Sequence, residues 1–531
     1  MNVAEALVAR LHAVGVAHIF GVPGGECNLD LIAASDKFGV DFVLTRTETA
    51  ASIMACVAGE LTGTVGVAMT TRGPGLTSAV NGVAFSDLDR SALLLIADGY
   101  GPDQEFVSHQ RIDQKAILAP LVRASAFLSR NGAVGQLNSL VSAALGQPPG
   151  PAYLEVTGAE IRAPAKEFLP HARAASPALS EISFAPARKL LSSAKRPVLI
   201  AGLQARSAAA CTALRTFATE TRCPVLTTYK AKGVMPETHP LAMGLYAGGV
   251  AEEPLIRDAD LVLLYGFDPV EGPPQAWRYN EITTLELTNV AFDLPLLEPA
   301  TSIVAEISST LAALTNDVCF DGWSQAELAQ HKERIWSAAR VPSNAGLSPT
   351  ALVESAMAHL PTDSRIAIDA GAHMLPVLHL WKCADLNQSL ISRGLSTMGF
   401  AVPAAIAASL VDRTRKTVAF TGDGGLMMCL GELGTARESG AQPIVVVFND
   451  SALTLIEAKQ RKRQLPRIGV SFKGTDFCRI AEGFGWRACR VSTREEADAA
   501  FAKAAVADEP FLIDALINPV TYDEIIARVR G

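Results

Sequence analysis

The sequence predicts an α/β protein built from three doubly wound parallel-sheet domains. Its 531 residues allow three or four domains at roughly 150 residues each. Short, nearly continuous apolar segments alternate with helical patterns along the chain, as expected of parallel strands covered on both faces. We expect the domains at residues 1–165, 183–320 and 349–531, with linkers near 161–179 and 341–348.

Each domain supplies its own strand candidates. In the first they are residues 18–22, 41–45, 65–70, 92–97 and 152–156. In the second they are residues 197–202, 224–229, 261–266 and 283–288, and in the third 365–370, 416–422, 443–449 and 510–517. Parallel strands end at a common edge of their sheet, where ligands bind. Functional residues are therefore expected directly after these segments.

The composition excludes several classes of protein. Apolar residues make up 49% and charged residues 19%, so much of the surface is expected to be hidden in cores or subunit contacts. A net charge of −8 argues against a nucleic-acid partner. The most apolar segment, 398–411, is too short for a membrane helix and contains Pro403. Nine scattered cysteines without a CxxC pair, and an amphipathic rather than signal-like start, favour the cytoplasm.

The most informative segment is 417–453, which contains two strand candidates joined by a helical pattern. The first strand ends at Gly422-Asp423-Gly424-Gly425, and the second ends at Asn449-Asp450. Glycines at a strand end let backbone N–H groups approach a phosphate. Two carboxylates at the same edge supply hard oxygen ligands for a divalent metal. An ordinary strand–turn–helix connection explains the glycines alone, but not the matching Asn-Asp pair.

This motif and its spacing resemble the thiamine diphosphate motif of the acetolactate synthase and benzoylformate decarboxylase superfamily. The resemblance implies thiamine diphosphate and Mg²⁺ as cofactors. It implies Asp423, Asp450 and the backbone carbonyl of Ala452 as metal ligands. The usual pair in this family is Asn-Asn, so the sequence leaves open whether Asn449 or Asp450 coordinates the metal.

The resemblance also assigns a catalytic acid. In this family a glutamate hydrogen-bonds the aminopyrimidine of the cofactor and activates its reactive carbon, and Glu48 occupies the matching position, after a strand and before an Ala-rich helix. The spacing Thr45-x-x-Glu48 also fits a capping box, in which Glu48 only satisfies a backbone donor. The metal motif favours the catalytic role. Glu60, further along the same helix, is expected to be solvated.

Further segments resemble the same family. Residues 70–99 resemble the segment in which the turn at Gly73 and Pro74 passes close to the pyrimidine of a neighbouring subunit's cofactor. Residues 393–410 resemble the segment whose methionine, here Met398, bends the cofactor and brings its reacting groups together. Ordinary core filling is the alternative role for Met398.

Three more cofactor contacts follow from the resemblance. The backbone carbonyl of Ser396 would hold the amino group of the pyrimidine, and His373 would touch the diphosphate. Ile456 stands where pyruvate decarboxylases have an acid near the reacting carbon, because Glu457 lies one position away and would face elsewhere on a helix. Lys459 replaces the tryptophan of herbicide-sensitive acetolactate synthases.

His109 and Gln110 are the candidates for handling the substrate, because segment 108–114 falls where the family places polar groups over the reacting carbon. A solvated polar loop is the alternative. In the central domain, 200–208 has only Gly202 in place of a GxGxxG motif, so FAD is possible but not favoured.

The resemblance implies a 2-oxo acid decarboxylase or carboligase that acts through an enamine. The alternatives are an acetolactate synthase, a carboligase or lyase that uses another donor, and a catalytically silent homologue that binds the cofactor. The expected partners are a small 2-oxo acid or an aldehyde. We expect a homodimer or homotetramer, with active sites between the N-terminal domain of one subunit and the C-terminal domain of another.

Overall fold

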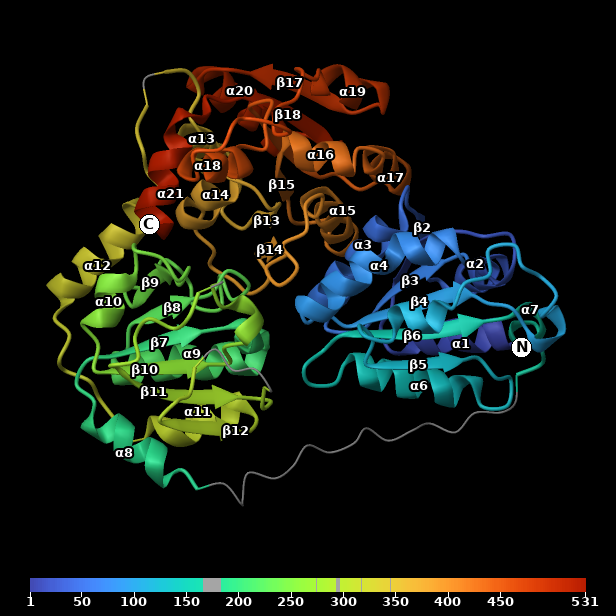
Figure 1. The fold of residues 1–531 in the computed structure, drawn as a ribbon, viewed down its shortest axis with the longest axis horizontal. Coiled ribbons are helices and arrows are strands. Elements are labelled where there is room, and N and C mark those ends of the chain that lie inside the picture. The colour runs from blue at the N-terminus through green and yellow to red at the C-terminus, as the bar shows by residue number, and fades with distance from the viewer. Residues whose placement is uncertain (166–182, 274, 293–296, 317, 344) are drawn as a thin grey trace.

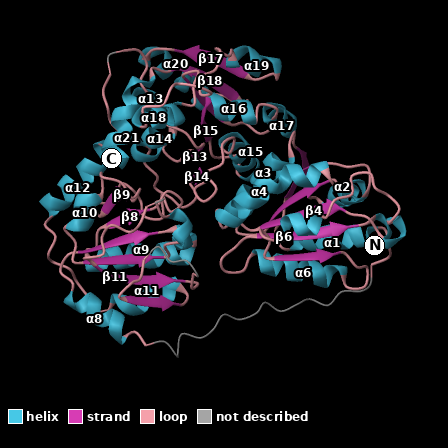
Figure 2. Ribbon diagram, viewed as in Figure 1, coloured by secondary structure: helices cyan, strands magenta, loops and turns pink. Residues whose placement is uncertain are grey.

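The chain folds into three separate six-stranded sheets (Figure 1). This computed structural model describes residues 1–531 except 166–182, 274, 293–296, 317 and 344, so most of the expected linker 161–179 lies outside the described residues. Every strand pair is parallel, and Figure 2 shows each group of strands flanked by helices. The predicted class, three doubly wound α/β domains, is confirmed.

The N-terminal sheet has the strand order β2-β1-β3-β4-β6-β5. Its strands are β1 (His18–Val22), β2 (Asp41–Leu44), β3 (Gly66–Thr70), β4 (Leu93–Asp98), β5 (Ala124–Phe127) and β6 (Pro151–Val156). Its helices are α1 (Val3–Ala13), α2 (Cys27–Phe38), α3 (Glu48–Thr62), α4 (Pro74–Leu88), α5 (Gln114–Leu118), α6 (Ala133–Ala144) and α7 (Gly158–Ile161).

The central sheet has the order β12-β11-β10-β7-β8-β9. Its strands are β7 (Pro197–Ala201), β8 (Val225–Thr227), β9 (Ala242–Leu245), β10 (Leu261–Tyr265), β11 (Thr283–Thr288) and β12 (Thr301–Val304). Its helices are α8 (Ala185–Ser193), α9 (Ala208–Thr221), α10 (Glu253–Arg257), α11 (Ile307–Thr315) and α12 (Gln325–Ser337).

The C-terminal sheet has the order β14-β13-β15-β16-β18-β17. Its strands are β13 (Arg365–Ile368), β14 (Ser389–Ile391), β15 (Thr417–Gly422), β16 (Ile444–Asn449), β17 (Arg487–Val491) and β18 (Phe511–Leu516). Its helices are α13 (Pro349–His359), α14 (Met374–Leu380), α15 (Ala401–Val411), α16 (Asp423–Met428), α17 (Glu432–Ser439), α18 (Thr454–Lys462), α19 (Phe477–Gly483), α20 (Arg494–Val506) and α21 (Tyr522–Arg530).

The two outer sheets share one topology. When strands are numbered along each domain, both have the order 2-1-3-4-6-5, whereas the central sheet has the order 3-2-1-4-5-6 of doubly wound nucleotide-binding domains. All the strands predicted from sequence are present, but five further strands, β5, β9, β12, β14 and β17, were not predicted. Each of the five forms an edge of its sheet.

The N-terminal and C-terminal domains share a hydrophobic core. Helix α15 buries every residue from Ala401 to Leu410 and packs in one cluster with α3 and α4. The rings of Phe85 and Phe400 meet across this junction, 5.3 Å between centroids. A helix that is apolar on all sides must be covered on all sides, which explains the apolar segment 398–411. No helix in the described part of the chain is long and apolar enough to span a membrane.

Candidate active site

A cavity of about 330 Å³ lies at the carboxyl edge of the C-terminal sheet. The loops that follow β13, β14, β15 and β16 form it, because parallel strands end at the same edge. Ten of the residues predicted to bind cofactor or metal line it: His373, Ser396, Met398, Gly422, Asp423, Gly424, Gly425, Asp450, Ala452 and Ile456. Glu457 does not line it and instead pairs with Arg461 at 2.6 Å.

Two acidic side chains line this cavity, of which Asp423 is buried and Asp450 is half-buried. Asp423 Oδ1 accepts a hydrogen bond from the Gly424 N–H at 2.7 Å, but Oδ2 is buried and has no hydrogen-bond partner among the described residues. Burial raises the pKa of Asp423. Burial also raises the pKa of Asp450 to about 6, and the negative charge of Asp423 adds to this effect. A divalent cation would relieve both the unpaired oxygen and the repulsion.

The neighbouring Asn449 is engaged elsewhere. Its side-chain N–H group donates to Asp514 Oδ1 at 2.8 Å, and Asn449 does not line the cavity. Of the Asn-Asp pair, Asp450 is therefore the residue whose side chain is available to a metal ion in this cavity.

Asp369, which the sequence analysis missed, connects the segments around the cavity through hydrogen bonds. Its buried carboxylate accepts hydrogen bonds from the N–H groups of Gly399 (3.0 Å) and Phe400 (3.2 Å) and from the Thr421 hydroxyl (2.9 Å). Burial raises the pKa of Asp369 to about 6. A Cβ atom at Gly425 would lie 2.3 Å from Asp369 Oδ2, so only glycine fits there. The sequence did contain a signal for Asp369, because this carboxylate directly follows an apolar strand.

His373 lies against the aromatic wall of the cavity. Its ring stacks on Phe448, with 5.3 Å between centroids. Burial lowers the pKa of His373 to about 4, so its imidazole is neutral near pH 7. The Nε2 atom is buried without a hydrogen-bond partner among the described residues, so this ring has one polar atom available to a ligand.

The segment that carries Ser396 and Met398 has an unusual backbone. Ser396 has φ +53°, in the left-handed region that favours glycine, and its hydroxyl donates to the Arg393 carbonyl at 3.0 Å. Met398 is half-buried and lines the cavity.

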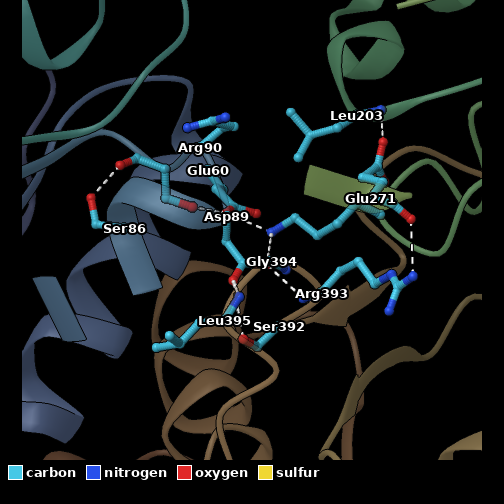
Figure 3. Close-up of polar contacts among 12 residues, drawn as sticks. Glu60, Ser86, Asp89, Arg90, Leu203, Glu271, Ser392, Arg393, Gly394 and Leu395 are labelled. Carbon is cyan, nitrogen blue, oxygen red and sulfur yellow. Dashed lines mark hydrogen bonds and ion pairs between the residues drawn. The ribbon is translucent and has the colours of Figure 1, made fainter. Parts of the chain in front are cut away.

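A buried aspartate from the N-terminal domain holds this segment (Figure 3). Asp89 accepts hydrogen bonds from the Arg393 N–H (2.6 Å), the Gly394 N–H (3.2 Å), the Leu395 N–H (3.1 Å) and the Ser392 hydroxyl (3.1 Å). The ammonium group of Lys230, from the central domain, lies 3.6 Å from Asp89. All three domains therefore meet just before Ser396.

Glu60 belongs to the same polar junction, and its predicted solvation is wrong. Its carboxylate pairs with Lys230 at 3.2 Å and Arg206 at 2.8 Å, and it accepts a hydrogen bond from Ser91. Burial alone would raise the pKa of Glu60, but the two cations hold it at about 2.

The remaining predicted residues gather at the carboxyl edge of the N-terminal sheet. Glu48 is the first residue of α3, and its carboxylate lies beside the turn at Gly75, where an added Cβ would be 3.1 Å from Oε1. The capping-box alternative is wrong, because the N-cap is Thr47, which accepts from the Ala50 N–H. Glu432 of the C-terminal domain holds the residues just before α3 in place. Its carboxylate accepts hydrogen bonds from the Arg46 N–H and the Thr47 hydroxyl.

His109 and Gln110 lie on the loop between β4 and α5, and Gln110 packs against the turn that contains Gly73 and Pro74. A Cβ atom at Gly73, which has φ +64°, would be 2.9 Å from Gln110 Cβ. The Gly73 N–H donates to Gln114 Oε1 at 3.0 Å. His109 and Gln110 line a second cavity, of about 440 Å³. Neither these two residues nor Glu48, Gly73 and Pro74 line the cavity of the C-terminal sheet.

Comparison with known proteins agrees with this geometry. Three family models match the chain in order: the thiamine pyrophosphate enzyme N-terminal TPP binding domain over residues 1–117, the central domain over 184–314 and the C-terminal TPP binding domain over 369–515. The chain therefore belongs to the thiamine pyrophosphate enzyme family.

Its relatives narrow the class of reaction. The chain is 28% identical to an acetolactate synthase of Bacillus subtilis, across 98% of this chain and 94% of that protein. It is 28% identical to a probable acetolactate synthase large subunit of Methanococcus aeolicus (98% and 92% covered) and 27% identical to a pyruvate oxidase of Lactiplantibacillus plantarum (97% and 88% covered). The protein is a thiamine pyrophosphate-dependent enzyme that forms or cleaves carbon–carbon bonds.

Proposed function

We propose that this enzyme decarboxylates a 2-oxo acid with thiamine diphosphate and Mg²⁺, and that it releases an aldehyde or joins the remaining fragment to a second carbonyl compound. The pair of Asp423 and Asp450, in which the buried Asp423 Oδ2 has no hydrogen-bond partner among the described residues, is the observation that carries the proposal. A site with this donor set suits a small, oxygen-preferring cation bound to a diphosphate.

Residues that line the cavity of the C-terminal sheet have the following proposed roles. Asp423, Asp450 and the Ala452 carbonyl would hold the metal, and Gly424 and His373 would contact the diphosphate. Met398 would support the bent form of the cofactor, and the Ser396 carbonyl would accept a hydrogen bond from its amino group. When bound, thiamine diphosphate supplies a carbanion that adds to the substrate carbonyl and accepts the electrons released with CO₂.

The N-terminal residues would complete the site from a second subunit. Glu48 would share a proton with the pyrimidine ring, the Gly73-Pro74 turn would contact that ring, and His109 and Gln110 would bind the reacting oxygen atoms. Two observations support a dimer or tetramer: this group does not line the cavity of the C-terminal sheet, and the residues of each group lie at a different sheet edge.

Carboligation between two 2-oxo acids is the second candidate. The names of the Bacillus subtilis and Methanococcus aeolicus relatives favour it. Ile456 also favours it, because an apolar side chain at this place in the cavity cannot donate the proton that would release an aldehyde.

We further propose that the central domain holds no flavin. In a sheet of this order the turn after the first strand receives the diphosphate of a dinucleotide. Here the Leu203 N–H in that turn donates to Glu271 Oε2 at 2.6 Å. The buried Glu271 thus already satisfies the N–H donor that a phosphate would need in this place. Absorbance of the purified protein near 450 nm would contradict this proposal.

Product analysis tests the proposed function. The enzyme, supplied with thiamine diphosphate and Mg²⁺, should release CO₂ from members of a panel of 2-oxo acids. With pyruvate alone, acetaldehyde indicates simple decarboxylation and acetolactate indicates carboligation.

Glu48→Gln should lower kcat at least 100-fold at unchanged Tm, while Asp423→Asn should weaken Mg²⁺-dependent cofactor binding in calorimetry. Full activity of either variant, or no carbon–carbon chemistry with any donor, would contradict the proposal.

A further inference from the structure

Arg72, next to the Gly73-Pro74 turn, is a buried cation without a matching anion. Its side chain is 92% buried, since only 8% of its surface is exposed. The Nε atom is buried and has no hydrogen-bond partner among the described residues, and none of their carboxylates forms an ion pair with the guanidinium within 4.0 Å. Leaving a buried charge unpaired is strongly destabilising. An anionic ligand would supply the missing partner.

The surroundings show where that ligand would lie. The Arg72 guanidinium stacks on the Tyr100 ring, 4.1 Å from its centroid, and both residues line the cavity of about 440 Å³ that also contains His109 and Gln110. Tyr100 is itself fixed, because its hydroxyl donates to the His109 carbonyl. The cation is thus held in place beside the residues proposed to bind the substrate.

Two acidic groups lie near Arg72, but among the described residues neither forms an ion pair with it within 4.0 Å. Asp98 is buried, and burial raises its pKa to about 6 although Arg72 acts in the opposite direction. Its Oδ1 accepts from Asn28 at 3.0 Å, and its Oδ2 has no partner among the described residues. Glu26 also lines the cavity, but its side chain is exposed and therefore screened by water and salt.

We propose that Arg72 binds a negatively charged group that the substrate retains through the reaction. This inference rests on the proposed function and specifies its substrate class. The group is either a second acidic group on the 2-oxo acid donor or the carboxylate of an acceptor molecule. Both present the same chemistry, an anion that a guanidinium pairs with directly.

The carboxylate lost as CO₂ is a poor partner for Arg72. When the carbon–carbon bond breaks, its electron pair stays with the former carbonyl carbon, and CO₂ leaves without charge. A guanidinium paired with that carboxylate would stabilise the substrate more than the transition state and would slow the reaction. An anion that keeps its charge gains equally in both states, so it improves binding without that penalty.

Two pairs of substrates distinguish the possible sources. For the donor, 2-oxoglutarate is compared with 2-oxopentanoate, which lacks the second carboxylate. For the acceptor, pyruvate is compared with acetaldehyde while pyruvate is the donor. In at least one pair, Arg72→Gln should lower kcat/KM for the charged member by about 10- to 100-fold, mainly through KM, and change the uncharged member less than about threefold.

Two further variants serve as controls. Arg72→Lys keeps the positive charge and should recover part of the preference. Lys115→Gln removes an exposed cation on α5 that does not line this cavity, and it should change neither pair. If Arg72→Gln affects both members of both pairs equally, or only lowers Tm, then Arg72 has a structural role and the inference is wrong.

A binding measurement separates this inference from the proposed function. Calorimetry with glutarate and with pentanoate, on the holoenzyme, needs no turnover. Should the wild type release no CO₂ from any substrate, tighter binding of glutarate that Arg72→Gln abolishes would still support an anion site, while the proposed function would fail alone. Absence of that difference in an inactive wild type would overturn both.

Discussion

At the residue scale, Glu271 is a carboxyl group held in a place that disfavours its charge. It is 97% buried, with only 3% of its surface exposed, and accepts hydrogen bonds from the Leu203 N–H and the Thr228 hydroxyl, both at 2.6 Å. Burial raises the pKa of Glu271 to about 7, and the charge of Asp268 contributes in the same direction. The folded protein therefore binds a proton here that the unfolded chain releases at lower pH.

This pKa shift predicts a pH-dependent stability. Between the ordinary value of 4.5 and about 7, the folded state holds more protons than the unfolded state, so the free energy of unfolding falls as the pH rises. The loss attributable to Glu271 is about 3 kcal/mol at most. Glu271→Gln removes it, so the decline in Tm between pH 5 and pH 8 should be shallower in calorimetry. The exposed Glu281→Gln serves as control, and equal slopes for Glu271→Gln and the wild type would contradict the expectation.

Single residues also show how much of the candidate site could be predicted from the sequence. The motifs identified ten residues that the fold brings into one cavity. They did not identify Asp369, Asp89 or Arg72, because each depends on contacts that no local pattern records. Glu60 was wrongly expected to be solvated, because its partner Lys230 lies 170 positions away. The alternative role for Glu48 as a cap failed for a local reason, since Thr47 and not Thr45 begins the helix.

At the element scale, the segment between β14 and α15 depends on Asp89 at the end of α4. Four donors from residues 392–395 converge on this one carboxylate, which orders the backbone just before Ser396 and Met398. A charged acceptor shared by several N–H groups contributes about 1.5–3 kcal/mol. Asp89 is thus a positioning residue for the candidate cofactor site.

Asp89→Asn should therefore weaken cofactor binding. The amide supplies one acceptor oxygen in place of two, so we expect the Kd for thiamine diphosphate to rise about 10-fold or more. The KM for the 2-oxo acid should change little, and the near-ultraviolet circular dichroism of the bound cofactor should change. Asp87→Asn, which removes a half-buried partner of Arg123 two residues earlier, is the matched control. A lower Tm with unchanged Kd would show that Asp89 only stabilises the fold.

The elements that the sequence did not reveal share a physical cause. Strands in the middle of a parallel sheet are covered on both faces and form long apolar segments. The missed strands are edges. Of these, β5, β12 and β17 are largely open to solvent, so their sequences lack such segments. The other two, β9 and β14, are buried but only four and three residues long, too short to distinguish from a loop.

At the scale of the whole molecule, the two groups of candidate residues predict complementation between subunits. We propose that one active site combines Glu48 of one subunit with Asp423 of another. Neither Glu48→Gln nor Asp423→Asn alone should be active. Co-expression should give mixed dimers with one intact site, and about one quarter of the wild-type activity if subunits pair at random.

A double variant provides the control for this experiment. Co-expression of Glu48→Gln with a chain that carries both substitutions leaves no intact site, so it should give no activity. Mixed dimers that are verified by differential tags yet remain inactive would show that each chain builds its own site.

The common strand order of the outer sheets has a consequence for the origin of this enzyme. In both sheets the third strand is followed by a glycine-rich turn, Gly73-Pro74-Gly75 after β3 and residues 422–425 after β15. In both, the second strand leads to the other key group, Glu48 after β2 and Met398 after β14. The residues proposed for the two parts of the active site thus lie at corresponding positions of the same sheet topology. Duplication of one ancestral domain would account for an enzyme whose two outer domains are proposed to bind opposite ends of one coenzyme.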